Sequence, residues 1–278
     1  MTDFHPSTRS EEFDELKTRH RAMWASGDYA TLATDIIWPL GPRVAEAAEI
    51  HPGDRVLDIA AGNGNVAIPA ALRGASVVAS DLTSELLERG RRLATEAGAE
   101  LEWRVADAED LPFGDDSFDV TVSCVGIMFA PHHQQAADEL LRVTRPGGRI
   151  ALLSWTPSGF IGRMFATLAP FNAPLPAGAS PAPLWGDEDH VRGLLGDGVT
   201  DLKAVRGTLD VDRFVAPDEF RRYFAKHYGP TIAVYNRNLG DPKRVAELDA
   251  ALDNLADSAT SIDGEMQWEY LLVTATVR

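Results

Sequence analysis

The sequence predicts an α/β fold: a Rossmann-like, doubly wound and mostly parallel seven-stranded sheet, with N-terminal lid helices and an inserted helical or irregular cap. Two observations lead to this prediction. Between residues 55 and 155, short apolar runs alternate with helical patterns, which is typical of a parallel sheet covered by helices on both faces. The first apolar run leads directly into Gly62 and Gly64, and the second ends in Asp81. A glycine loop after the first strand and an acid at the end of the second hold an adenosine ribose in such sheets.

Composition limits the kinds of partner. The 278 residues can bury one large domain or one and a half, and the 45% hydrophobic content is that of an ordinary globular protein. The net charge of −16 argues against a nucleic-acid partner, because phosphate binding normally needs a basic patch. No apolar run is long enough to span a bilayer. We therefore expect a small-molecule acceptor, no membrane insertion, and either a monomer or a homodimer.

Cysteine and histidine usage limits the chemistry further. Cys124 is the only cysteine, so no internal disulfide and no cysteine metal cluster is expected, and its apolar strand favours a buried, inert thiol. The histidines and acids show no metal-ligand spacing, so we expect no metal. The N-terminus shows no basic segment followed by an apolar stretch, so we expect no signal peptide and a cytoplasmic location.

Residues 1–50 are expected to form lid helices that precede the sheet. Apolar residues at helical spacing, interrupted by glycine and proline, predict helices over 11–24, 29–38 and 41–50.

Residues 51–156 are expected to form the ligand-binding core. Apolar runs bounded by turn residues predict five strands in this part, over 55–60, 76–80, 101–105, 120–125 and 149–155. Between them we predict a helix beginning near Asn65, a helix from Thr83 as its cap to Ala97, and a helix over 134–143.

Residues 157–258 are expected to form a cap around a sixth strand, and 259–278 the final strand of the core. The stretch 156–186 holds six of the seventeen prolines together with several aromatic residues. Disordered segments are poor in aromatic residues, so we predict a mobile or irregular lid with an apolar inner face. The later elements are predicted as a strand over 200–206, helices over 217–227 and 241–257, and a strand over 269–277.

The glycine loop alone leaves two ligand classes open. Gly62-x-Gly64-x-x-Ala67 satisfies the dinucleotide fingerprint with alanine in third place. A dinucleotide would bring its pyrophosphate to this loop, close to the negative charge of Asp58. S-adenosylmethionine has no phosphate, and its ammonium and sulfonium groups would be favoured by a nearby carboxylate. Asp58 therefore favours the methyl donor, whereas Asp81 suits either ligand, since a carboxylate can accept from both ribose hydroxyls.

The core resembles the class I S-adenosylmethionine-dependent methyltransferases, in particular the small-molecule branch related to ubiquinone and menaquinone biosynthesis. The resemblance covers about residues 50–155, in the order and spacing of that family. The matching residues are Val56-Leu57-Asp58-Ile59-Ala60-Ala61-Gly62-Asn63-Gly64, Asp81, Asp107-Ala108-Glu109-Asp110-Leu111-Pro112-Phe113, Phe118-Asp119 and Leu141-Arg142-Val143-x-Arg145-Pro146-Gly147-Gly148.

The resemblance implies transfer of a methyl group from S-adenosylmethionine to an oxygen, nitrogen or carbon nucleophile of a small aromatic or lipophilic acceptor, with S-adenosylhomocysteine as product. It also implies roles for individual residues. Asp81 would hold the ribose hydroxyls, Leu82 would pack on the adenine, and Asp107 and Ala108 would contact its amino group and ring. The methionine end would be held by Asp58, Ala60, Gly62, Asn63 and Gly64, with Ser123 or Cys124 beside it.

Methyl transfer mainly requires alignment of a nucleophile, and a general base helps only where that nucleophile carries a proton. His132 and His133 follow the fourth strand, at the sheet edge where open α/β folds bind ligands, and are the candidate bases; a helix-capping or surface role is the alternative. His20, His190 and His227 are weaker candidates. The acceptor is expected to contact Trp24, Tyr29, Met128, Phe160 and Trp185, although Trp24 and Tyr29 could instead pack against the sheet.

Two other functions fit parts of the sequence. An NAD(P)-dependent oxidoreductase would use the same glycine loop, but Asp58 and the acidic loop at Asp107 disfavour it. A donor-binding protein that has lost catalysis and serves as a binding or regulatory partner is the second alternative, because this family requires no single residue for methyl transfer.

Overall fold

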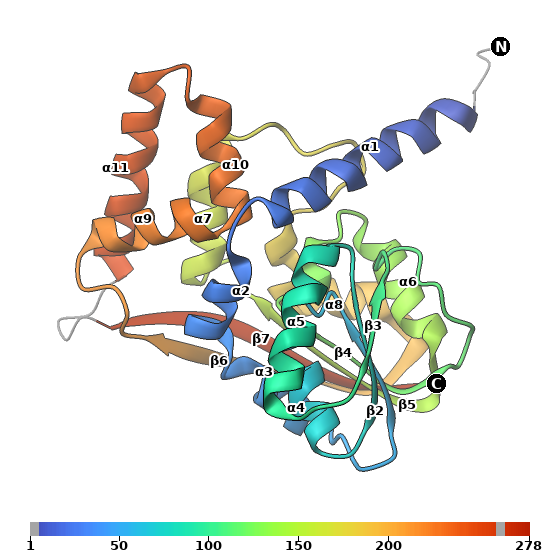
Figure 1. Ribbon diagram of the computed structural model, residues 1–278. Coiled ribbons are helices and arrows are strands. Elements are labelled where there is room, and N and C mark those ends of the chain that lie inside the picture. The colour runs from blue at the N-terminus through green and yellow to red at the C-terminus, as the bar shows by residue number, and fades with distance from the viewer. Residues whose placement is uncertain (1–5, 260–264) are drawn as a thin grey trace.

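A seven-stranded sheet forms the centre of the computed structural model, which describes residues 6–259 and 265–278 (Figure 1). The strand order is β3-β2-β1-β4-β5-β7-β6, and β7 runs antiparallel to both of its neighbours whereas the other pairs are parallel. The strands are β1 (Arg55–Ile59), β2 (Ser76–Asp81), β3 (Glu102–Val105), β4 (Phe118–Cys124), β5 (Thr144–Trp155), β6 (Val199–Val211) and β7 (Met266–Val277). This sheet confirms the predicted fold class.

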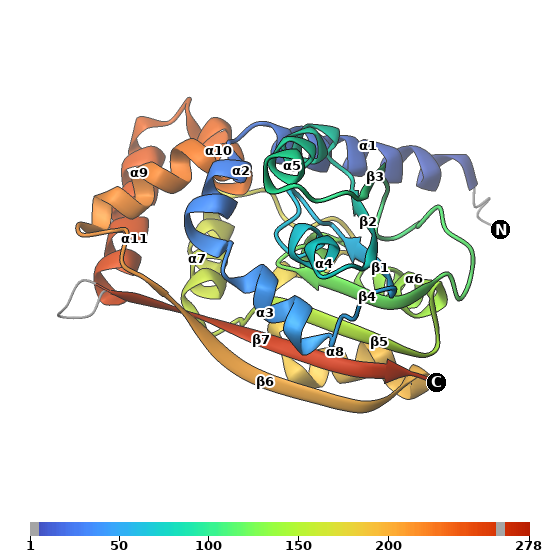
Figure 2. The ribbon, with the colours of Figure 1, turned by 60° about the horizontal axis from the view of Figure 1, so that its bottom comes forward.

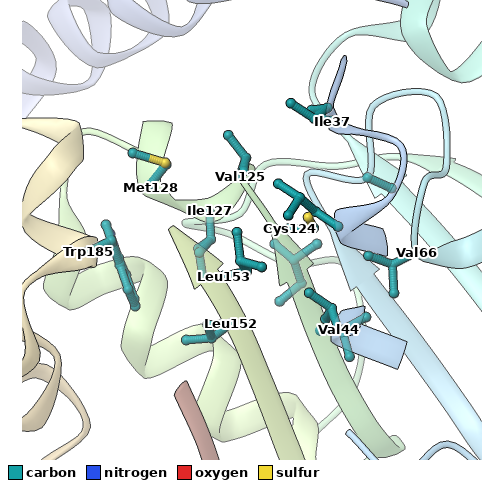
Figure 3. Packing of buried hydrophobic residues seen from close by; sticks show 14 of the residues in the cluster. Ile37, Val44, Val66, Cys124, Val125, Ile127, Met128, Leu152, Leu153 and Trp185 are labelled. Carbon is teal, nitrogen blue, oxygen red and sulfur yellow. The ribbon is translucent and has the colours of Figure 1, made fainter. Parts of the chain in front are cut away.

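Helices cover both faces of the sheet (Figure 2). One face carries α3 (Leu40–Ala47), α4 (Ala67–Leu72) and α5 (Ser84–Ala97), and the other carries α6 (His133–Val143) and α8 (Glu188–Leu195). The central strands are therefore buried on both sides and can be apolar throughout. Figure 3 shows the result, with Leu152 and Leu153 of β5 lying between Trp185 on one side and Val44 on the other.

The residues at the ends of α5 and at the beginning of β5 can be compared with the predicted element boundaries. Gly98 ends α5 in a left-handed conformation with φ of 71°, as expected for a C-terminal glycine. Thr83 lies at the predicted N-cap position, although its side chain makes no capping bond. Residues 145–148 lie within β5, which begins five residues earlier than predicted; the pairing with β4 is irregular there, and Gly147 has φ of 73°.

The N-terminal helices reach the carboxyl ends of the parallel strands. α1 (Pro6–Ala25) runs from the cap across this edge of the sheet (Figures 1 and 2). The segment predicted as one helix over 29–38 is α2 (Tyr29–Leu32) followed by a π-helical turn over Ala33–Ile37. Such π-helical turns are rare and occur frequently at functional sites.

The cap contains more regular structure than the sequence predicted. The proline-rich stretch includes the helix α7 (Phe160–Leu168), and α10 (Gly229–Asn238) was not predicted because it begins with Gly229-Pro230. Proline is tolerated in the first turn of a helix, where its missing N–H has no partner to lose. The other cap helices are α9 (Pro217–His227) and α11 (Pro242–Ala259). Residues 1–5 of the predicted lid and residues 260–264 of the predicted C-terminal segment lie outside the described residues.

No helix within residues 6–259 combines the length and the apolar character that a membrane crossing requires.

Candidate functional site

A cavity lies at the carboxyl ends of β1, β2 and β4, with α1 and the π-helical turn on its other side. We call it the first cavity. Its empty volume is about 780 Å³, part of it open to solvent, which is in the range of small-molecule sites. Eight of the residues predicted to hold a nucleoside ligand line it: Ala60, Gly62, Asn63, Asp81, Leu82, Asp107, Ala108 and Cys124. The topology therefore gathers most of the predicted donor residues around one space.

The backbone around this cavity takes conformations that most residues avoid. Gly62 and Gly64 have φ of 56° and 86°, which confirms the reason for two glycines in the loop. Ala60 and Val125 also have positive φ, at 53° and 51°, and both line the cavity. A residue held in this region costs about 1–3 kcal/mol, and such residues cluster at functional sites.

Asp81 is the buried carboxylate of the first cavity. Its side chain accepts a hydrogen bond from the Gly62 N–H at 2.9 Å and one from the Thr83 N–H at 2.7 Å. Burial raises the pKa of this carboxyl, and the two backbone bonds oppose that shift. The residue keeps 8% of its surface exposed and lines the cavity, so it fixes the glycine loop while facing the ligand space.

Asp58 does not face the cavity, which corrects one expectation. Its carboxylate is 1% exposed and accepts a hydrogen bond from the Ala67 N–H at 3.0 Å, at the beginning of α4. Burial raises the pKa of Asp58 to about 8. The carboxylate therefore holds α4 and the preceding loop in place, instead of contacting a ligand in the first cavity.

Ser123 and Gly64 also support the site from behind. The Ser123 hydroxyl donates to the Ile59 carbonyl at 2.7 Å and accepts from the Ile127 N–H at 2.8 Å, so the prediction that it approaches the ligand is wrong. Gly64 faces away from the cavity, because a Cβ on this residue would lie 2.7 Å from the Trp103 ring. Both residues connect the loops that follow β1 and β4 to the sheet.

Helix α1 is fastened to the loop after β3. The Lys17 ammonium lies 2.8 Å from the Asp107 carboxylate and 2.6 Å from that of Glu109, and it is nearly buried. One turn later, the Arg21 guanidinium donates to the Leu82 carbonyl at 3.2 Å. These contacts hold α1 over the end of the cavity where Leu82 and Asp107 lie.

His132 and His133 lie outside both cavities described in this section, which corrects their prediction as bases. The His132 backbone N–H donates to Glu109 at 2.7 Å, and its ring lies 3.1 Å from the same carboxylate. His133 is 2% exposed and its ring contacts that of His190 at 2.9 Å. Burial lowers the pKa of His133 to about 4. His132 lies at the N-cap position of α6 without a side-chain capping bond, and His133 packs in the interior.

A second cavity lies between α1, the loop after β4, α7, α10 and the proline-rich segment. Its empty volume is about 1520 Å³, part of it open to solvent. Apolar side chains dominate its lining, and the polar side chains of its described lining are His20, Asn172 and Ser180, with no Asp, Glu, Lys or Arg. This confirms that the proline-rich segment has an apolar inner face.

Four residues line both cavities and so mark where they meet: His20, Trp24, Phe129 and Pro131. The rings of Trp24 and Phe129 pack edge to face, with centroids 4.6 Å apart. These four residues therefore form a wall between the two cavities.

The residues predicted to contact an acceptor divide into two groups. Trp24 lines both cavities, Met128 lines the second and Tyr29 lines the first. Phe160 and Trp185 line neither cavity and are each 1% exposed, so the prediction is wrong for them. Phe160 stacks on Trp268 in the core, and Trp185 packs against His133.

Sequence reasoning missed Lys17, Asn65 and Phe129 as lining residues, and it placed His20 among the weaker candidates. Lys17, His20 and Trp24 follow one another at intervals of three and four residues, so they share a face of α1. That spacing was a signal, but it does not say which part of the chain the helix faces. Among the described residues, no group of three or more histidine, cysteine or acidic side chains is arranged to hold a metal ion.

This chain is similar to known proteins in both sequence and structure. A family model described as a methyltransferase domain matches residues 57–152. A demethylmenaquinone methyltransferase of Paenarthrobacter aurescens is 31% identical over 196 residues, which cover 64% of this chain and 76% of the relative. A Mycobacterium tuberculosis protein described as uncharacterized is 52% identical over 99% of both chains. The solved structure of the YcgJ protein of Bacillus subtilis has the same fold, with a TM-score of 0.57 at 20% identity, covering 85% of this chain and 97% of that one.

Proposed function

This chain belongs to the class I S-adenosylmethionine-dependent methyltransferases, and we propose that its acceptor is a small, uncharged, apolar molecule held in the second cavity. S-adenosylmethionine is its methyl donor, and the donor supplies a methyl group activated by a sulfonium. The observation that carries the proposal is the arrangement of the two cavities. A cavity with a buried carboxylate and a glycine loop meets an apolar chamber at a wall of four residues.

The residues of the first cavity fit the donor. The Asp81 carboxylate has accepted two backbone bonds and retains lone pairs on the side of the cavity, where the two ribose hydroxyls can donate. Leu82, Asp107 and Ala108 would hold the adenine. Gly62, Asn63 and Cys124, which line the same cavity, would hold the methionine end.

Cys124 must lie close to the donor without reacting with it. Its thiol is buried, and burial with the nearby Asp58 carboxylate raises its pKa far above the usual value. The thiolate is the nucleophilic form of cysteine, so a thiol that stays protonated does not compete for the methyl group. The buried, inert state expected for Cys124 would therefore prevent methylation of its own sulfur in this site.

The apolar lining selects the acceptor. A charged acceptor entering the second cavity would lose its hydration and would meet no opposite charge among the described lining residues. An apolar body gains about 25 cal/mol for each Å² that it buries. The wall at Trp24 and Phe129 would exclude water from the meeting point and align the acceptor, and alignment can supply ~7–11 kcal/mol of the barrier.

Ligand binding followed by a transfer assay tests the proposal. S-adenosylhomocysteine at about 100 times its Kd should add ~2.7 kcal/mol of stability and raise the melting temperature by several degrees, whereas NADH should not. Labelled S-adenosylmethionine should then methylate members of a panel of uncharged lipophilic compounds in preference to matched amines and carboxylates. Stabilisation by NADH alone, or exclusive methylation of charged acceptors, would contradict the proposal.

A further inference from the structure

His20 brings a titratable side chain to the second cavity. It is the only such group in the described lining of that cavity, and it also lines the first cavity. It lies on α1 between Lys17, which fastens the helix, and Trp24, which forms part of the wall. The His20 ring therefore borders the donor and the acceptor spaces at once.

The His20 ring is free to take a proton. Within residues 6–259 and 265–278, neither of its ring nitrogens makes a hydrogen bond or ion pair with another side chain or with the backbone. Burial and the Lys17 ammonium lower its pKa from 6.5, so the imidazole is neutral near pH 7. A neutral imidazole with an unengaged nitrogen can act as an acceptor for a proton.

Charged groups of both signs act on the His20 ring. The Asp107 and Glu109 carboxylates act to raise its pKa, whereas the Lys17 and Arg19 side chains act to lower it. Lys17 also pairs with both carboxylates, so its charge and theirs partly cancel. The two carboxylates therefore offset part of the destabilisation of the imidazolium that burial, Lys17 and Arg19 cause.

The second cavity restricts which nucleophile can be presented there. Amines are protonated near neutral pH and carboxylic acids are ionised, and the described lining offers neither charge a partner. A hydroxyl is neutral and can donate a hydrogen bond to His20. A phenolic hydroxyl, with a pKa of about 10, is acidic enough for histidine to assist its ionisation.

We propose that the acceptor is a lipophilic phenol, methylated on its oxygen, and that His20 is the catalytic residue that accepts the phenolic proton. This inference rests on the proposed function and specifies its substrate class. The O–H bond breaks and its proton moves to a His20 ring nitrogen as the oxygen forms a bond to the methyl carbon. The bond between that carbon and sulfur breaks, and its electron pair stays on sulfur. The imidazolium then returns its proton to water after the methyl ether has left.

The test compares His20→Gln with His51→Gln in the full chain. His51 precedes β1 at the opposite end of the strands, and its side chain is 63% exposed. The acceptors are alkylphenols of graded acidity, including a nitro-substituted analogue that is already ionised at the assay pH, with alkylamines and fatty acids as references. The readouts are the Kd for S-adenosylhomocysteine, kcat against pH for each phenol, and the position of the methyl group in the product.

His20→Gln should lower kcat for an un-ionised alkylphenol by about 10²–10⁴-fold and the rate for the ionised analogue far less. Wild-type kcat should rise with pH through the lowered pKa of His20, below 6.5, and the variant should lack that step. His51→Gln should keep the wild-type profile, and the Kd for S-adenosylhomocysteine should stay similar in all three proteins.

Several results would overturn the inference. An equal loss for all phenols would mean that His20 only supports the structure, and no loss would remove it from catalysis. Methylation of amines or fatty acids but not phenols, or transfer to a ring carbon, would refute the substrate class while leaving methyl transfer intact. Donor binding without transfer to any phenol would also refute it. Failure to bind S-adenosylhomocysteine at all would instead defeat the proposed use of the first cavity.

Discussion

The Asp81→Asn variant separates ligand binding from stability. The substitution keeps the shape of the side chain but removes its charge and one of its two acceptor oxygens. In the wild type those oxygens already accept from the Gly62 and Thr83 N–H groups at 2.9 and 2.7 Å. If the carboxylate also accepts from two ribose hydroxyls, each of those bonds is worth ~1.5–3 kcal/mol, because the acceptor is charged.

The expected loss of binding free energy follows from the ribose bonds that the variant cannot make. Asparagine can keep at most one ribose bond, so the loss is at least ~1.5–3 kcal/mol, or about a 10- to 100-fold rise in the Kd for S-adenosylhomocysteine. Stability should respond differently. The folded-state pKa of Asp81 is raised by burial, so the wild type loses stability as the pH rises from 3.8 through that pKa. The variant has no charge to bury and should lack this decline.

Asp119→Asn is the matched control, because the pH dependence of stability that comes from Asp119 has the opposite sign to that from Asp81. Asp119 accepts from the Arg55 N–H and the Arg145 side chain, each at 2.7 Å, and these bonds lower its pKa. Its stabilising contribution is therefore present above pH 3.8 and is lost as the pH falls through the lowered pKa. The side chain is partly exposed, so its substitution should cost about 1 kcal/mol or less.

Isothermal titration measures the Kd for S-adenosylhomocysteine, and urea unfolding between pH 4 and 8 measures the free energy of unfolding. The expected pattern is weak binding with a flatter pH dependence for the Asp81 variant, and normal binding for the Asp119 variant. An Asp81 variant that binds as tightly as the wild type would refute the assignment of this carboxylate to the ribose. Equal weakening by both variants would mean that the loss reflects general destabilisation.

Three further predictions follow from the geometry. Asp58, with a pKa of about 8, should make the wild-type free energy of unfolding fall from pH 4 to 8 with a slope of up to ~1.4 kcal/mol per pH unit. Urea unfolding of Asp58→Asn should lack this slope, and an unchanged slope would mean that another residue causes it. Gly41→Ala should lower the melting temperature at a cost of ~1–3 kcal/mol, because the new Cβ would overlap the Asn65 carbonyl, whereas Gly193→Ala, with nothing within 4 Å, should be neutral or stabilising; equal effects would contradict this. Lys17→Met should increase amide hydrogen exchange in α1, because it removes contacts to two carboxylates, and unchanged exchange would show that α1 is held by packing alone.

The sheet was predictable because its signals are local. Apolar runs bounded by glycine and proline located the parallel strands to within a few residues, and Gly62 and Gly64 have the positive φ that their spacing required. Asp81 was predictable for a related reason, since a residue at the end of β2 must lie at the ligand-binding edge of the sheet.

The direction of individual side chains was less predictable. Asp58 and Asp81 both end up beside the glycine loop, yet one accepts from α4 and the other lines the cavity. Successive positions on a strand alternate between faces, but the twist and the following turn decide which carboxylate reaches a ligand. His20 required knowledge that α1 crosses the sheet edge, and that depends on contacts with residues distant in the sequence, such as Lys17 with Asp107, 90 positions away.

The position of β7 constrains how the chain assembles during synthesis. β7 lies between β5 and β6 in the sheet, although it follows both of them in the chain and is synthesised after them. Until residue 277 is available, β5 has an open edge and β6 has no neighbour in the sheet. Nascent chains with unpaired strand edges are prone to misassociate. A truncation before β7 would therefore cost this protein both of these strand pairings, even though every described lining residue of both cavities precedes β7 in the chain.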